Sequence, residues 1–141
     1  MGEDYQLAYA GLAVVLITLL VQMLVASYSK ARQPGAVPGK IDESLSHQSF
    51  VFRAHRTFMN SLENLPLFFG TVFLALFVGL SSTWVAVTVW VFALARIAHM
   101  VLYYGLATER NPSPRSYFYL IALLANVVLL VGLVLQLANM V

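Results

Sequence analysis

The chain has 141 residues, of which 60% are hydrophobic and only 10% are charged. Soluble domains carry about 25% charged residues, so this composition excludes a soluble globular protein and indicates a membrane protein of one domain. The net charge of +2 is small, and the chain has no cysteine. We expect no nucleic-acid partner, no disulfide and no thiol nucleophile, so any sulfur chemistry has to come from a substrate.

The first predicted span covers about residues 7–28 and carries no charge. It follows Glu3 and Asp4 rather than a basic segment and is too long for a signal-peptide core, so we expect a mature span. Roughly twenty apolar residues cross a hydrocarbon core of about 30 Å. The span stops at Lys30 and Arg32, and the breakers between residues 33 and 46 predict a loop.

Three further spans are predicted over about residues 47–80, 84–104 and 114–141. The second is longer than a bilayer core, so its polar first third should lie beyond the lipid or line a cavity. Ser113 is a suitable N-cap for the last span, with Pro114 at the first helical position. The expected fold is therefore an all-α, four-helix transmembrane bundle that spans residues 1–141 as a single domain.

Polar side chains gather on three of these spans. On a helix that turns about 100° per residue, a stripe on the second span occupies an arc of roughly 100°: Arg56, Asn60, Glu63 and Asn64. The third span has a narrower stripe of about 60°: Arg96, His99 and Tyr103. The first two turns of the fourth span add Arg115, Ser116 and Tyr119. Polar groups that enter an apolar span are costly unless they face protein, water or a polar ligand, so they predict a functional site.

The distribution of charge predicts the orientation in the membrane. The loops after the first and third spans lie on one side, and most of the lysines and arginines are found there or beside them. The only charged residues on the opposite side are Glu3 and Asp4. The positive-inside rule places both termini outside the cytoplasm and the polar stripes towards it.

Together the three groups offer cations, one carboxylate, amides, a hydroxyl and phenols. This set suits a zwitterionic, peptide-like ligand, because arginines bind carboxylates in a bidentate manner and Glu63 can hold an ammonium group. The start of the fourth span favours an anion, and Arg115 adds a full charge. A thiol with an ordinary pKa of about 8.5 placed there would be driven towards the reactive thiolate, with Ser116 as a hydrogen-bond donor.

These residues resemble a known family. The run Arg56-x3-Asn60-x2-Glu63-x2-Pro66, with Arg96-x2-His99-x3-Tyr103 and Arg115-Ser116-x2-Tyr119, is similar to the MAPEG family, the membrane-associated proteins in eicosanoid and glutathione metabolism. The resemblance covers about residues 22–125. It implies a bundle assembled as a homotrimer that binds glutathione between neighbouring subunits near the cytoplasmic face.

The resemblance also implies roles for single residues. Arg56, Asn60 and Glu63 match positions that hold glutathione, and we add Asn64, which stands where the leukotriene synthase branch has a tyrosine. Further positions match those that line the site in the prostaglandin synthase branch: Arg96, His99, Tyr103 and Tyr119. Arg115 matches the arginine that stabilises the thiolate, with Ser116 as its neighbour, and Arg32 resembles a basic residue that meets a glutathione carboxylate. Arg53 becomes the signature arginine if the helix is read one turn earlier, but Arg56 alone gives the Asn60 and Glu63 spacing.

The expected function is that of a glutathione transferase or peroxidase that acts on lipophilic electrophiles from the bilayer, among membrane lipids. Two alternatives stay open: a non-catalytic lipid-binding or scaffold member of the same fold, and a small four-span exporter. An exporter commonly needs a carboxylate near mid-bilayer, whereas Glu63 lies near one face.

Structural interpretations compete with these assignments. Arg56, Glu63 and Arg96 can form an intramembrane salt-bridge set that joins helices. Arg53 and Lys30 are interpreted as interfacial anchors. No second histidine or carboxylate lies one turn from His99 on its helix, so no metal site is predicted.

Overall fold

The computed structural model describes residues 5–140 and contains four long helices. They are α1 (Gln6–Ala31), α2 (Phe50–Phe77), α3 (Ser82–Gly105) and α4 (Pro114–Ala138). Each is long and apolar enough to cross a membrane. The predicted all-α transmembrane bundle is therefore confirmed, and the chain is a multi-pass membrane protein.

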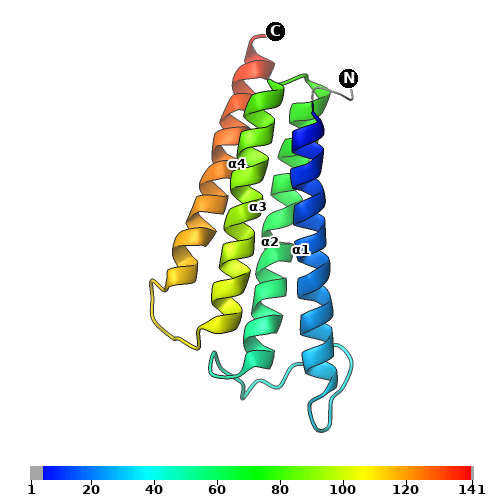
Figure 1. Ribbon diagram of the computed structural model, residues 1–141, viewed down its shortest axis with the longest axis vertical. Coiled ribbons are helices and arrows are strands. Elements are labelled where there is room, and N and C mark those ends of the chain that lie inside the picture. Colours follow the sequence, from blue (N-terminus) through cyan, green and yellow to red (C-terminus); the bar gives the residue numbers. More distant parts are fainter. Residues whose placement is uncertain (1–4, 141) are drawn as a thin grey trace.

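The helices run alternately up and down, so that the described chain begins and ends at the same end of the bundle (Figure 1). That end also holds the short turn between α2 and α3, and we call it the turn end. The opposite, loop end carries residues 32–49 and 106–113. The helices α2 and α3 contact each other and both outer helices, whereas α1 and α4, both fully described, do not touch.

The bounds of α2 differ from those expected. The helix begins at Phe50 rather than His47, because Ser49 is its N-cap and the backbone N–H of His47 instead donates to Glu109. It ends at Phe77, and Gly79 then takes a φ of 69°, a left-handed conformation that glycine adopts without steric cost. The start of α4 at Pro114 agrees with the prediction. Glu3 and Asp4, which entered the orientation argument, lie outside the described residues.

Close packing of apolar residues forms the bundle towards the turn end. The rings of Phe68 and Phe92 stack between α2 and α3 with centroids 3.7 Å apart. A Cβ on Gly132 would lie 2.7 Å from the indole nitrogen of Trp84, so this glycine lets α4 approach α3 closely. Small residues serve helix contacts in this way in membranes, where apolar burial provides little driving force.

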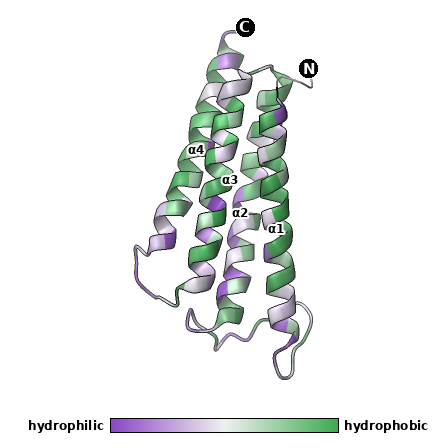
Figure 2. Cartoon of the chain, viewed as in Figure 1, coloured by the Kyte–Doolittle hydropathy of each residue, from purple (hydrophilic) through white to green (hydrophobic). Residues whose placement is uncertain are grey.

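Polar residues collect in the other half of the molecule. Figure 2 shows hydrophilic and intermediate colours on the loop-end halves of α2 and α3 and in the two long loops. The stripes predicted from the sequence lie in this half, so the fold brings them to one end of the bundle.

Candidate functional site

Arg96 joins the stripes of α2 and α3. Its side chain is only 4% exposed, and its two terminal nitrogens donate to Asn60 Oδ1 and Ser61 Oγ, each at 2.8 Å. Both partners are neutral, and Glu63 is exposed. Among residues 5–140 the acid–base contact found joins His47 and Glu109, and no described carboxylate lies within 4.0 Å of the Arg96 guanidinium, so the interpretation of Arg96 and Glu63 as a salt bridge is wrong for the single chain.

The α3 stripe continues towards the loop end and meets the start of α4. The guanidinium carbon of Arg115 lies 4.1 Å from the centre of the Tyr103 ring, a cation–π contact. The His99 ring meets Tyr103 edge-on at 5.5 Å and lies 6.5 Å from the Tyr119 ring. His99 is buried, and its Nδ1 has no hydrogen-bond partner within the described part of the chain. The structure thus brings together four of the predicted site residues: His99, Tyr103, Arg115 and Tyr119.

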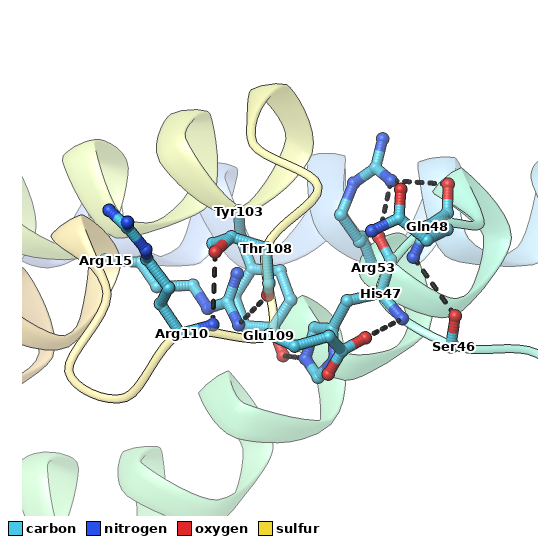
Figure 3. A network of polar contacts seen from close by, with 9 residues as sticks. All are labelled: Ser46, His47, Gln48, Arg53, Tyr103, Thr108, Glu109, Arg110 and Arg115. Atoms are coloured by element: carbon cyan, nitrogen blue, oxygen red, sulfur yellow. Dashed lines mark hydrogen bonds and ion pairs between the residues drawn. The ribbon is translucent and has the colours of Figure 1, made fainter.

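Arg115 is held by one hydrogen bond and keeps donor capacity in reserve. Its Nη2 donates to the carbonyl of Thr108 at 3.2 Å (Figure 3). Its Nη1 is buried and without a partner among the residues described. A buried guanidinium N–H without an acceptor is costly, because buried polar groups are almost always satisfied. We therefore expect this donor to be satisfied by an acceptor from outside the single chain, such as an anion.

The neighbouring Ser116 has a role in starting α4. Its Oγ accepts a hydrogen bond from the backbone N–H of Ser113 at 3.2 Å and lies 3.2 Å from the Ser113 hydroxyl. Because the backbone contact uses only a lone pair, the hydroxyl proton of Ser116 can be donated to the Ser113 hydroxyl or to another acceptor.

The other members of the α2 stripe divide into engaged and free groups. Asn64 Nδ2 donates to the carbonyl of Asn60 at 2.7 Å, so this amide binds its own helix. Arg56 is half-buried and Glu63 is exposed, and neither side chain makes a hydrogen bond to any residue between 5 and 140. Both side chains are therefore free to bind a further partner.

Two arginines lie apart from this cluster. Arg32 Nη1 donates to the Tyr28 hydroxyl at 2.8 Å on its own helix, so the structure does not join it to the stripes. Arg53 is 9% exposed and donates to three carbonyls, those of His47 (2.7 Å), Gln48 (2.9 Å) and Tyr104 (3.3 Å). The interpretation of Arg53 as an interfacial anchor is therefore wrong, because its guanidinium is buried and its terminal nitrogens donate to carbonyls inside the protein.

Three residues of these networks were not identified from the sequence. Ser61 follows Asn60 directly and lies on the buried face of α2. A hydroxyl among the apolar residues of that face is a sequence signal that could have identified it. His47 and Glu109 are 62 positions apart and form a pair through two loops. No periodic pattern in the sequence indicates a contact between two loops.

One cavity lies at the loop end, and a much smaller one lies between the middle parts of α1, α2 and α3. A cavity of about 490 Å³ lies beneath the loop between α1 and α2, with Lys30 and Lys40 in its wall. The cavity bounded by Arg96, Gln22 and Ser61 measures about 10 Å³, which is room for roughly one water molecule. In one chain Arg96 of α3 contacts α2, and His99 and Tyr103 of α3 contact α4. That these groups form one ligand site stays a prediction.

Comparison with known proteins gives one finding. The sequence profile of the MAPEG family matches residues 7–135, nearly the whole chain. Searches among curated proteins and among solved structures return no match.

Proposed function

The chain belongs to the MAPEG family, and on that premise we propose that it is a membrane-embedded, glutathione-dependent transferase or peroxidase. Membership supports a membrane protein of glutathione or eicosanoid metabolism, a family that includes both enzymes and non-catalytic members. We therefore base the assignment as an enzyme on the side chains at the loop end.

One observation carries the proposal: Arg115 presents a buried, unpartnered Nη1 beside the N-terminus of α4. The helix dipole adds partial positive charge, and the Ser116 hydroxyl adds a neutral donor. An anion that reaches this donor gains a charge-assisted hydrogen bond. A scaffold has no evident need for such a donor, whereas a thiolate nucleophile does.

The remaining polar groups match the other parts of glutathione. Arg56 and Arg96 supply charge for the two carboxylates, Asn60 an amide, and Glu63 an acceptor for the ammonium group. Arg56 and Glu63 lack partners in the described chain, which supports a site completed by a neighbouring subunit. We therefore propose a homotrimer with glutathione between subunits.

The chemistry follows from the thiolate. An ordinary thiol with a pKa of about 8.5 is mostly protonated at neutral pH, and the positive charge of Arg115 favours its ionised form. The thiolate sulfur then attacks an electrophilic carbon, a C–S bond forms, and the leaving group departs with the bonding electrons. With a lipid hydroperoxide, sulfur attacks the terminal oxygen, the O–O bond breaks, and the alkoxide takes a proton and leaves as an alcohol. The thiolate of a second glutathione then attacks the sulfenic sulfur, the S–O bond breaks to release water, and the disulfide forms. Lipophilic substrates reach the site from the bilayer.

The same proposal assigns an orientation. The long loops hold Lys30, Arg32, Lys40 and Arg110, so the positive-inside rule places the loop end in the cytoplasm, where glutathione is abundant.

The test compares wild type with Arg115→Ala and Arg56→Ala in lipid nanodiscs. Calorimetry measures glutathione binding, and 1-chloro-2,4-dinitrobenzene reports conjugation. We expect Arg115→Ala to lower kcat about 100-fold to 1000-fold, as loss of one oxyanion donor does. Arg56→Ala should mainly weaken binding, and Arg110→Ala, in the exposed loop, is the matched control.

Two results would overturn the proposal. One is the absence of glutathione binding to wild type, and the other is a conjugation rate that neither site variant changes. Copurified lipid without turnover would instead favour the scaffold member of the family. Native mass spectrometry tests the trimer.

A further inference from the structure

A second polar network at the loop end is not used by the proposed function. Figure 3 shows His47 between Glu109, from the loop after α3, and Tyr103, from the last turns of α3. His47 Nδ1 lies 2.9 Å from Glu109 Oε2, and its backbone N–H donates to Glu109 Oε1 at 3.1 Å. Its Nε2 lies 3.0 Å from the Tyr103 hydroxyl.

The carboxylate determines where the imidazole proton lies. An ionised carboxylate only accepts hydrogen bonds, so His47 Nδ1 carries a proton and donates it to Glu109. In the neutral imidazole Nε2 is then bare and accepts the O–H of Tyr103. The carboxylate, imidazole and phenol thus form one directed chain of hydrogen bonds, in which each group fixes the orientation of the next.

The opposite partner of Tyr103 is Arg115, the proposed catalytic residue. Its guanidinium lies over the Tyr103 ring at 4.1 Å, while the His47 ring stacks near the same ring at 5.8 Å. A phenol that donates its proton to a base has a more electron-rich ring, which strengthens the cation–π contact. The other contact of Arg115 is the Thr108 carbonyl, adjacent in sequence to Glu109. Both supports of the guanidinium are therefore connected to the His47–Glu109 pair.

The pair is itself anchored to α2. The buried Arg53 donates to the His47 carbonyl at 2.7 Å, and the Phe52 ring meets the imidazole edge-on at 4.9 Å. His47 is 22% exposed and Glu109 is 59% exposed. The network thus connects the start of α2 with the loop that carries Thr108, although neither member touches the predicted glutathione residues of α2.

We propose that His47 and Glu109 are positioning residues that hold Tyr103 and the Thr108 carbonyl, and through them orient Arg115 for the thiolate. This inference rests on the proposed function. It assigns the two residues no contact with glutathione, so their effect should appear in catalysis and thiolate formation more than in binding.

The test uses Glu109→Gln, which keeps the size of the side chain and removes its charge, and His47→Phe, which keeps a stacked ring and removes both hydrogen bonds. Glu43→Gln, an exposed carboxylate in the loop before α2, is the matched control. We expect kcat to fall about 10-fold to 100-fold in both test variants, since small misplacements of a catalytic group have effects of this size. The KM for glutathione should change less than about twofold, and the ultraviolet thiolate band should appear at higher pH.

A double-mutant cycle separates this role from a merely structural one. In an Arg115→Ala background, Glu109→Gln should produce no further loss of kcat, because its effect acts through Arg115. An equal loss in both backgrounds would overturn the inference, and so would wild-type rates in Glu109→Gln. Glu109→Gln is a surface change and keeps the test valid if His47→Phe does not fold. Wild type that neither binds nor turns over glutathione would instead overturn the proposed function itself.

Discussion

The two ends of the bundle are held together by different interactions. In the half of the bundle towards the turn end the Phe68–Phe92 stack packs at 3.7 Å. There the Tyr5 hydroxyl donates to the carbonyl of Leu80, in the turn between α2 and α3, at 2.6 Å, and the Trp90 indole N–H donates to the carbonyl of Leu7 in α1 at 2.9 Å. At the loop end polar and charged side chains are buried, and several of their atoms have no partner in the part of the chain that the structure describes. These include Gln22, Arg53 Nε, His55, His99 and Arg115.

This difference suggests that the two ends contribute differently to stability and to function. Packed apolar residues and satisfied polar groups give one well-defined structure, whereas unsatisfied groups reduce stability and persist where they serve another purpose. We therefore infer that the turn end acts as the scaffold, and the loop end remains the proposed place for a ligand. Variants that affect only one of these properties test this division.

Of the following variants, Arg96→Ala is expected to have the largest effect. Arg96 contributes to both the scaffold and the proposed ligand site. The change removes two charge-assisted hydrogen bonds and leaves Asn60 and Ser61 unpaired, so the free energy of unfolding should fall by about 3 kcal/mol. Thermal unfolding in detergent measures this loss, and calorimetry should show weaker glutathione binding as well. Normal stability would show that Arg96 is not part of the scaffold.

Glu63→Gln should affect binding alone. The side chain is exposed and makes no contact that the described chain would lose, so the unfolding temperature should stay unchanged. If Glu63 holds the ammonium group, the Kd for glutathione should rise by about 10-fold to 30-fold, equivalent to roughly 1.5–2 kcal/mol for a charged hydrogen bond. The control ligand is an S-alkylated glutathione analogue that lacks the amine. Its affinity should be the same for wild type and for Glu63→Gln. Equal loss for both ligands would contradict the assignment.

Gly132→Ala should affect the scaffold alone. The added methyl group would meet the Trp84 indole nitrogen at 2.7 Å, so α3 and α4 must move apart, at a cost of about 1–2 kcal/mol in unfolding free energy. Gly70→Ala is the matched control, because nothing lies within 4 Å of its Cβ position. Glutathione affinity should stay the same in both variants. A clear loss of affinity in Gly132→Ala would remove the separation of the two ends.

The smallest effect is expected for Ser44→Ala in the loop between α1 and α2. The Ser44 hydroxyl and backbone N–H donate to Asp42 Oδ1 at 2.7 and 2.9 Å, and these bonds hold the pKa of the Asp42 carboxyl below its ordinary value. A lowered folded-state pKa stabilises the loop above the ordinary pKa, and this is lost as pH falls through the lowered value. Ser44→Ala should raise the Asp42 pKa, which a carbon NMR titration measures, without changing glutathione turnover. An unshifted titration would show that the hydroxyl bond is absent.

Much of the fold was predictable from the sequence, because span length and apolar composition depend on local residues. The start of α4 at Pro114 followed from local capping chemistry, and helical periodicity placed Arg96, His99 and Tyr103 on one buried face. The partners of these residues were not predictable. The bonds from Arg96 to Ser61 depend on the rotation of α2 against α3, and the pairing of His47 with Glu109 depends on two loops. Contacts of this kind leave no period in the sequence.

The central claim is that glutathione binds at the loop end with its sulfur beside Arg115. An experimental structure of the protein in lipid with glutathione tests it most directly. The account predicts density for the tripeptide between subunits, with the sulfur within hydrogen-bond distance of Arg115 and the amine beside Glu63. Density confined to the cavity beneath the α1–α2 loop, near Lys30 and Lys40, would contradict it.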